Sequence, residues 1–342
     1  MKSVYFFQLF TRNIYKDIGL ILINIFGLSV GIAISILIYL WILYELDFDK
    51  FHEDYEKIYR VIRISTEGES LKKNTLVDLP LARALKSNFP QIESATAVSC
   101  NNSPKDFLIG EKLMKLKMSY IEESFFKVFS FPIVAKADSL FLPHDHSVVI
   151  TRNCALKLFG NTDCLGEEIT LSFYGKKELK VSAIIDNPEN SHLQFEILLP
   201  FSSSRVLLSN MNKWNTVRAV CYIKFKEKRA VTKKEFEELR KFLMDKAGQE
   251  ALLSFQPLED IHLHTDFPDR FAFENSDIRY VRIFILSVFL LLIISNINFV
   301  ILSAARSEKR RKEIAVTMLN VILLLCILNF IKTTSWPLIL LF

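Results

Sequence analysis

The longest apolar stretch of the chain runs from Ile18 to Tyr44 without a charged side chain. A helix needs about 20 consecutive apolar residues to cross a bilayer, whereas the apolar part of a cleaved signal peptide has only about 7–15. The stretch ends in Tyr39, Trp41 and Tyr44, aromatic residues of the kind that gather at membrane surfaces. We therefore predict a retained transmembrane helix over 18–44.

A second uncharged stretch, Ile283 to Leu302, predicts another transmembrane helix over 281–303. Asn296 and Asn298 lie inside it. Because amide side chains in a bilayer need hydrogen-bond partners, we expect these two to bond to a neighbouring helix.

Small residues recur every four positions in the first helix, at Gly27, Gly31 and Ser35. This spacing places them on one face, where another helix backbone can approach closely. The pattern predicts helix packing but does not identify the partner helix. If the partners are further membrane helices that this chain lacks, most of the packing on this face would be lost.

Two weaker segments lie at the ends of the chain. Residues 1–17 carry apolar side chains near helical spacing together with Arg12 and Lys16. This favours an amphipathic cytoplasmic segment in the membrane interface, or an extension of the first helix. Residues 317–342 are apolar but interrupted by Lys332 and Pro337, which predicts a truncated or atypical third transmembrane helix.

The region between the two helices, 45–280, is long enough for a domain with its own core. Alternating and β-branched runs predict strands, and runs of helical period bounded by turn residues predict helices. Strands are expected over 58–65, 147–151, 179–185 and 219–225, and helices over 81–89, 153–159 and 233–246. The predicted fold class is a membrane protein whose α-helical transmembrane spans flank a large α+β domain of two lobes.

Charge near the helix ends predicts the orientation. Basic residues dominate the segment after the second helix, whereas Glu45, Asp47 and Asp49 follow the first. Because basic loops stay on the cytoplasmic side, we expect a cytoplasmic N-terminus and a periplasmic 45–280 in a multi-pass protein of the bacterial inner membrane.

Composition agrees with a charged domain joined to membrane helices. Half of the 342 residues are apolar, the formal net charge is +5, and the mean hydropathy is +0.23. These values exclude a disordered chain. The basic residues are not gathered into the footprint of a nucleic-acid-binding protein.

The sequence contains no phosphate-binding G-x-x-x-x-G-K-[ST] loop, no G-x-S-x-G motif and no H-E-x-x-H motif. We therefore expect neither enzymatic activity nor a cofactor. Two histidine pairs, His144 with His146 and His262 with His264, would each share one face of a strand and could supply two metal ligands. Neither pair has a third ligand at an obvious spacing, so we expect no metal site.

Four cysteines fall in the predicted periplasmic region, which permits oxidation. They are Cys100, Cys154, Cys164 and Cys221. Free buried thiols are the favoured interpretation. A disulfide between Cys154 and Cys164 stays open, because sequence alone does not give connectivity.

Several stretches, in this order along the chain, resemble the MacB-like/FtsX-like permeases of ABC transporters. One begins YELDFDKFH directly after the first helix, and another reads DNPENSHLQFEILLPFS. The matching stretches are 44–63, 123–134, 147–171, 186–202, 256–264 and 298–316.

The resemblance implies a MacB-like periplasmic core domain at 45–280, with a second lobe inserted into the first, and the start of an FtsX-like membrane domain. It implies an ABC ATPase partner on the cytoplasmic side, and a remaining permease half or second copy, with a periplasmic adaptor or lipoprotein as a further candidate. ATP-driven movement would pass to the periplasmic domain for export or envelope remodelling. The expected ATPase contact is 304–316, with Arg306, Lys309, Arg310, Arg311 and Lys312. Binding to anionic lipid headgroups is the alternative role of these cations.

The resemblance ends near Val316, where the family continues into a basic coupling segment and further membrane helices. We therefore expect the chain to be an N-terminal fragment of a permease. The alternatives are a membrane-anchored periplasmic sensor or ligand-binding protein without transport activity, and a membrane-anchored enzyme. A sensor would need a cytoplasmic output domain, and an enzyme would need a catalytic set in 45–280.

Overall fold

The structure is a computed structural model that describes residues 18–67, 70–109, 112–172, 177–228, 252–265 and 276–306, with short pieces at 237–238, 241–242, 245–246 and 322–323. The chain divides into two compact units. One comprises 1–43 and 279–342 and contains the long helices; the other comprises Tyr44–Ile278.

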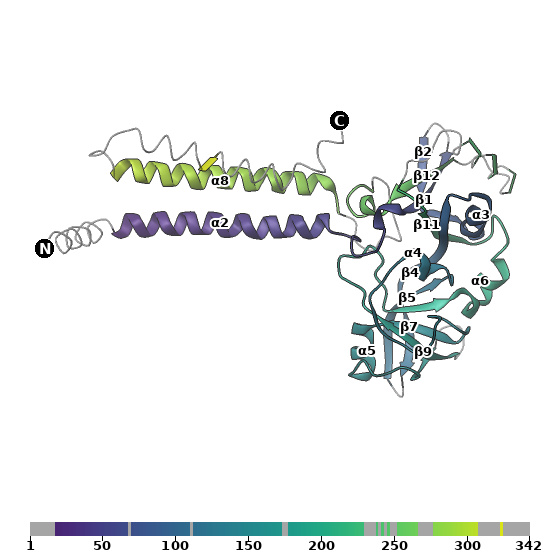
Figure 1. Ribbon diagram of the computed structural model, residues 1–342. Helices are drawn as coiled ribbons and strands as arrows, with labels where there is room; N and C mark the ends of the chain where they lie inside the picture. Colours follow the sequence, from purple (N-terminus) through teal and green to yellow (C-terminus); the bar gives the residue numbers. More distant parts are fainter. Residues whose placement is uncertain are drawn as a thin grey trace. The chain divides into compact units, whose positions relative to one another are not determined.

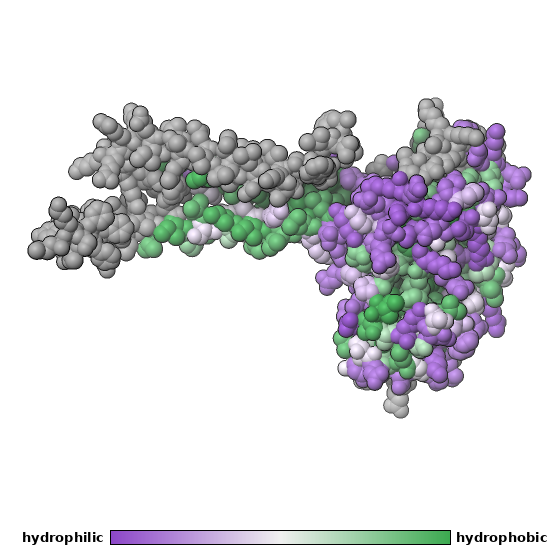
Figure 2. Space-filling model, in the orientation of Figure 1, coloured by the Kyte–Doolittle hydropathy of each residue, from purple (hydrophilic) through white to green (hydrophobic). Residues whose placement is uncertain are grey.

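The helical unit contains most of α2 (Ile18–Leu46) and α8 (Ile278–Arg306). Both predicted helices are confirmed, each a few residues longer than expected. Both are long and apolar enough to cross a membrane by length and composition. Apolar side chains follow α2 in Figure 2, as expected of a helix surrounded by lipid.

The two long helices pack together through small residues. A Cβ atom added to Gly31 of α2 would collide with the hydroxyl of Ser295 on α8. The Ser35 hydroxyl donates a 2.8 Å hydrogen bond to the Gly31 carbonyl. Further along, the rings of Trp41 and Phe284 meet edge to face with centroids 4.8 Å apart. The packing prediction is therefore confirmed at Gly31. Its partner is α8 of the same chain, so this contact does not depend on further helices.

The described hydrogen bond of Asn296 lies within its own helix. Its amide donates a 2.7 Å hydrogen bond to the Leu292 carbonyl, one turn earlier in the same helix. A helix can satisfy an amide from its own backbone in this way, so no neighbouring helix is required. The side chain of Asn298, the segment 1–17, and the third helix predicted at 317–342 (apart from 322–323) lie outside the described residues.

The second unit is an α+β domain built on one mixed sheet (Figure 1). Its described strands are β1 (Ile58–Glu67), β2 (Ser70–Asn74), β3 (Leu76–Asp78), β4 (Ile92–Ile109), β5 (Lys112–Ile121), β6 (Ile133–Lys136), β7 (Ser147–Thr151), β8 (Glu168–Leu171), β9 (Lys177–Ile185), β10 (Ile197–Pro200), β11 (Arg218–Phe225) and β12 (Leu252–Pro257). Its described helices are α3 (Leu81–Asn88), α4 (Phe125–Val128), α5 (Arg152–Phe159) and α6 (Arg205–Asn210), with short 3-10 turns η1 (Tyr55–Lys57), η2 (Phe201–Ser203) and η3 (Leu258–Asp260). The four predicted strands and the helices at 81–89 and 153–159 are confirmed; most of 233–246 lies outside the described residues.

The strand order is β12-β1-β11-β4-β5-β10-β7-β9-β6. Strands β6 to β10 follow β5 in the chain and precede β11, so they form an inserted segment at one end of the sheet. Separate cores lie under the two ends, around Leu85 and α3 on one side and around Cys154 and α5 on the other. The prediction of two lobes needs this refinement: the sheet is continuous between them.

Local sequence explains the limits of α5. The Thr151 hydroxyl accepts a 3.2 Å hydrogen bond from the Cys154 N–H and caps the helix start. Gly160, with a φ of 75°, ends the helix in the left-handed region that glycine adopts without strain.

Replacing Gly31 with leucine should separate α2 from α8, because the new side chain would overlap Ser295. Leucine at Gly19 is the matched control, since a Cβ there meets nothing within 4 Å. The substitutions Trp41→Cys and Phe284→Cys, joined by a short bismaleimide, report the contact. We expect Gly31→Leu to reduce the cross-linked fraction strongly and Gly19→Leu to leave it unchanged. Equal cross-linking in both variants would contradict the observed packing.

Candidate functional site

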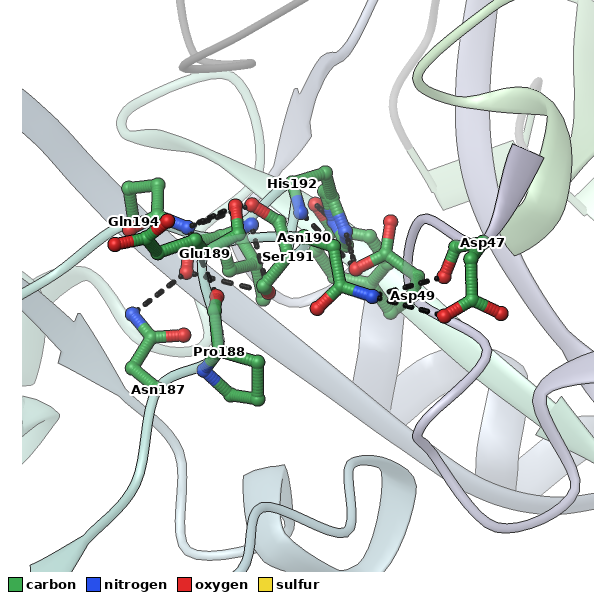
Figure 3. Close-up of polar contacts among 11 residues, drawn as sticks. Asp47, Asp49, Asn187, Pro188, Glu189, Asn190, Ser191, His192 and Gln194 are labelled. Carbon is green, nitrogen blue, oxygen red and sulfur yellow. Dashed lines mark hydrogen bonds and ion pairs between the residues drawn. The ribbon is translucent and has the colours of Figure 1, made fainter. Parts of the chain in front are cut away.

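Two loops far apart in the sequence meet at the point where the chain leaves α2. Asp49 lies just beyond that helix, and its N–H donates a 2.8 Å hydrogen bond to the Asn190 carbonyl. In return, the Asp49 carboxylate accepts a 3.0 Å bond from the His192 N–H, 143 residues away in sequence. Figure 3 shows these groups facing one another. The two segments are therefore joined through both backbone and side chain.

At the centre of this contact, a buried carboxylate faces a buried imidazole. His192 Nδ1 lies 2.8 Å from Asp49 Oδ1, and both side chains are 1% exposed. His192 Nε2 lies 2.9 Å from the Tyr222 hydroxyl on β11. With the proton on Nδ1, facing the carboxylate, Nε2 accepts from the tyrosine. Aspartate, imidazole and phenol thus form one chain of contacts from the 44–52 segment into the sheet.

The 187–194 loop is held in shape by its own amides. Asn187 donates to the Leu193 carbonyl at 3.0 Å, and Gln194 donates to the Ser191 carbonyl at 2.9 Å. Asn190 reaches outward to Asp47, donating to its carbonyl at 3.1 Å and to its carboxylate at 3.3 Å (Figure 3). A loop ordered in this way presents the His192 N–H to Asp49 with little further loss of entropy.

Asp49 also has a strained backbone. Its φ is 61°, in the left-handed region that residues other than glycine rarely adopt. Such strain persists where the surrounding contacts over-determine it, and it concentrates at functional sites. The second carboxylate oxygen, Oδ2, is buried and has no hydrogen-bond partner among the described residues.

His52 lies next to this pair in an aromatic environment. It is 2% exposed, and its ring centroid lies 4.0 Å from that of Phe51 and 4.8 Å from that of Phe131. Neither ring nitrogen has a well-directed hydrogen-bond partner in the described part of the chain. Burial lowers the pKa of His52 to about 4, outweighing the opposing attraction of Asp49. The imidazole is therefore neutral at pH 7.

A second contact ties the end of α2 to the turn that follows β12. The Glu45 carboxylate lies 2.8 Å from His262 Nε2, and Phe48 stacks on the His262 ring with centroids 3.5 Å apart. The same turn bonds the start of α8. The His262 carbonyl accepts from the Ser276 N–H at 2.9 Å, and the Leu263 carbonyl from the Ile278 N–H at 3.1 Å.

A buried arginine on β1, Arg60, anchors the turn after β12. Arg60 is 1% exposed and donates to the Gln256 side-chain oxygen at 2.7 Å and to the Thr265 hydroxyl at 3.3 Å. Gln256 donates to the Asp260 carbonyl at 3.2 Å. We call Glu45, Asp49, His52, His192, Tyr222 and His262 the root cluster, because they hold both chain segments by which the domain joins its long helices.

The root cluster positions segments and offers no access to a substrate. Asp49, His192 and Tyr222 are at most 2% exposed, so a reactant cannot reach the carboxylate, imidazole or phenol. Among the described residues, no group of three or more His, Cys, Asp or Glu side chains could hold a metal ion.

Neither histidine pair lies on a strand, as the alternation argument assumed. His262 and His264 follow η3 in a turn and not a strand, so the alternation argument fails for them. Each faces a different carboxylate: His262 faces Glu45, and His264 faces Asp260 at 3.0 Å. His144 and His146 lie in the loop before β7 with their rings stacked, centroids 5.1 Å apart.

The described cysteines are free and buried, as favoured from the sequence. They are Cys154, Cys164 and Cys221; the side chain of Cys100 lies outside the description. Burial raises the pKa of the Cys154 thiol to about 12 and that of Cys221 well above its ordinary value. Such thiols react poorly, because the thiolate is the reactive form.

The predicted ATPase contact lies mostly outside the described residues. Arg306 is the last residue of α8, and its side chain is not described; Lys309, Arg310, Arg311 and Lys312 follow beyond it. Of the helix-packing candidates, Gly31 is buried against Ser295 of α8, and Ser35 is buried. Gly27 is half-buried, and Asn296 bonds within its own helix.

Residues 21–238, well over half of the chain, match the family model of the MacB-like periplasmic core domain. The chain belongs to this family. The resemblance drawn from the sequence is thereby confirmed, and the protein is a membrane-anchored member with a periplasmic α+β domain of MacB type. The match includes both loops of the Asp49–His192 contact.

One solved structure supports the fold of the MacB-like domain, and two others are reported with it. A domain of a candidate permease from Porphyromonas gingivalis aligns with a TM-score of 0.51 and 19% identity, covering 60% of this chain and 92% of that one. The periplasmic region of MacB from Actinobacillus actinomycetemcomitans gives 0.43 and 16%, over 60% and 90% of the two chains. The extracellular domain of the noncanonical ABC-type transporter YknZ from Gram-positive bacteria gives 0.41 and 11%, over 58% and 99%. No curated protein matches the chain.

Asp49 and His192 both lie in stretches that carry the family resemblance, but nothing in the sequence indicates that they meet. The one available signal was that the segments LDFDKFH and NPENSHLQ, both rich in polar residues, lie within the stretches that carry the family resemblance. Spacing within one segment cannot reveal a contact between residues 143 positions apart, as Asp49 and His192 are.

Truncating Asp49 to alanine should destabilise the MacB-like domain by about 2 kcal/mol or more, because the buried backbone and ring N–H groups of His192 would lose their acceptor. The matched control is Asp186→Ala, which breaks the exposed Arg152–Asp186 pair at 2.6 Å and should cost less than about 1 kcal/mol. Urea unfolding of the compact unit 44–278 measures both. Similar losses in the two variants would show that the Asp49 contact is not the stronger constraint.

The His52 environment predicts a pH dependence of stability. Its folded pKa, about 4, lies below the ordinary value of 6.5, so the unfolded chain binds the proton first as the pH falls. The stabilising effect is complete above pH 6.5 and is lost as the pH falls towards 4. At pH 5 the loss is about 2 kcal/mol, from roughly 1.36 kcal/mol for each pH unit.

The measurement is the free energy of unfolding of 44–278 at pH 7 and pH 5. His52→Phe, which suits the aromatic surroundings, should lose less stability than the wild type on acidification. His146→Phe, at an exposed histidine, should retain the wild-type slope. An unchanged slope in His52→Phe would mean that other groups govern the acid sensitivity.

Proposed function

We propose that the chain is the permease subunit of an ABC transporter, or the N-terminal part of one, and that it couples ATP hydrolysis by a partner to movement of its periplasmic domain. The family match supports a permease-type role. The observation that carries the coupling proposal is the root cluster, which bonds the end of α2 and the start of α8 to the same turn.

The physical argument concerns stiffness. A force arriving along a helix reaches a domain only if the connection between them does not yield. Glu45 lies in the last turn of α2, His262 in the turn after β12, and that turn bonds Ile278 at the start of α8. Buried, hydrogen-bonded groups resist local opening more than exposed loops do. Both connections therefore transmit movement to β1 and β12 through Arg60 and Gln256.

The cytoplasmic end of the proposed path is the basic segment 304–316. Its cations are suited to contact an ATPase, and they are equally suited to anionic lipid headgroups. In this proposal the periplasmic domain carries no catalytic group of its own, and the energy comes from the partner. Export or envelope remodelling is the resulting process.

The test is ATP-driven transport by the chain, expressed with the ATPase and any further permease sequence encoded beside it. The double variant Glu45→Gln, His262→Phe should still co-purify with the ATPase and retain ATP turnover. Transport should fall strongly, because the joint between α2 and the turn after β12 is loosened. Arg152→Ala with Asp186→Ala, which removes an exposed ion pair of the same domain, should leave transport unchanged.

Replacing Arg310, Arg311 and Lys312 with glutamate should have a different effect. Co-purification with the ATPase should fail, while the periplasmic domain remains folded. Membrane orientation is checked in the same variant with a periplasm-specific reporter fused after Asp138. Undiminished transport by the Glu45/His262 variant would refute coupling through the root cluster. Failure of the wild type to associate with any ATPase would refute the permease role.

A further inference from the structure

A cavity of about 590 Å³ opens on the periplasmic domain, away from the root cluster. It lies between α3, α4 and the segment around η2, which immediately precedes α6. Its volume falls within the roughly 300–1,000 Å³ of sites that bind small molecules. Neither the family match nor the coupling proposal uses it.

The floor of the cavity is apolar and the rim is cationic. Ile121, Leu142, Phe201 and Met211 line it with hydrocarbon and aromatic surface. Arg83 and Lys86 come from α3, three positions apart and therefore on one helix face, and Lys127 comes from α4. An apolar floor beneath a charged rim suits a ligand with two chemically different ends.

The charges that face the cavity do not cancel. Glu122 is 6% exposed and already engaged: one oxygen lies 2.8 Å from Arg83 Nη2, and the other accepts from the Ala97 N–H at 2.9 Å. This pair fixes the inner wall and uses the charge of Arg83. What remains at the rim is Lys86 and Lys127 against the exposed Glu123, a net charge of +1.

The two lysines have hydrogen-bond capacity to spare. Lys86 donates one bond, to the Ile92 carbonyl at 3.0 Å, and an ammonium group has three donors. Lys127 is exposed, and its ammonium group makes no hydrogen bond or ion pair with another described residue. Both can therefore turn to an anion in the cavity without breaking an existing ion pair.

We propose that this cavity binds a small amphiphilic anion, with a carboxylate or phosphate group held by Lys86 and Lys127 and an apolar body on Ile121, Leu142, Phe201 and Met211. The Arg83–Glu122 pair acts as a fixed wall and not as a ligand. The proposal stands apart from the coupling mechanism, since no member of the root cluster lines the cavity.

The probes are octanoate and octyl phosphate, which share the tail and differ in the anionic group. Acetate lacks the tail, and octylammonium reverses the charge. The full chain is held in lipid nanodiscs, and ligand-observed saturation-transfer NMR measures binding after subtraction of empty nanodiscs. We expect saturable binding of octanoate, octyl phosphate or both, and none of acetate or octylammonium. The stronger of the two anions identifies the head group.

Variants then locate the site. Lys86→Gln with Lys127→Gln should weaken anion binding about tenfold or more, a loss of about 1.4 kcal/mol or greater. Lys127→Gln alone should weaken it measurably while the fold stays intact, because the Lys127 ammonium bonds to no other described residue. Glu123→Gln should strengthen it, because a repelling charge is removed. The matched control, Lys115→Gln with Lys180→Gln, removes two exposed lysines that do not line the cavity and should leave binding unchanged.

Two outcomes would overturn the proposal. Equal binding of octylammonium and octanoate would show partition into an apolar surface without charge recognition. Anion binding unaffected by the Lys86/Lys127 and Glu123 variants would place the bound anion elsewhere. Neither result bears on the coupling proposal, which is tested separately by the transport activity of the Glu45→Gln, His262→Phe variant.

Discussion

The buried contact between the Asp49 carboxylate and the His192 imidazole is the one on which the arrangement of the domain depends. Taking a carboxylate and an imidazole out of water is unfavourable unless each finds a partner, and here each is held by further groups. The His192 and Asp49 backbone N–H groups, the Asn190 carbonyl and the Tyr222 hydroxyl complete the set. A hydrophobic contact at this place would tolerate sliding. A buried pair with fixed donors accepts one register only, and so it sets where the chain enters the sheet.

The neighbouring His262 contact extends this constraint to the second connection. Glu45 and Phe48 meet His262 from one side, and Ser276 and Ile278 bond the backbone of the same turn. The domain thus receives both of its covalent connections at one place. The Arg60–Gln256 contact then links two paired strands, β1 and β12, which lie next to each other at the edge of the sheet order.

Periodicity predicted local elements well and contacts between them poorly. The run 18–44 and the strand SVVIT at 147–151 carry their own signal, because apolar length and β-branched content act within a few residues. The small residues around Gly31 also predicted close packing, because a residue without a side chain lets another helix approach. The sequence could not identify the neighbour, which the structure shows to be Ser295. The bond of Asn296 to its own helix was not foreseen, because spacing does not distinguish an amide that bonds its own backbone from one that bonds a neighbour. The His262–His264 pair was misjudged because a turn replaces the strand on which the argument rested. Asp49, His52 and His192 could not be found from spacing at all, as their meaning arises from burial and from partners on distant strands.

The strand order has a consequence for how the domain is made. Strand β1 emerges first, and its far end can pair at once with β2, but the part from Ile58 to Val61 pairs with β11 and β12. Arg60 meets Gln256 across 196 residues. Pairings of such long range are slow to form, because the chain must close a large loop before the contact stabilises it.

During synthesis this part of β1 therefore stays unpaired with β11 and β12 until nearly the whole domain has crossed the membrane. Over that interval Cys154, Cys164 and Cys221, which the finished core shields, are open to oxidation in a compartment that favours disulfides. The folded protein is safe from the reaction to which its nascent chain is most vulnerable, so the yield of native protein depends on how fast the sheet closes.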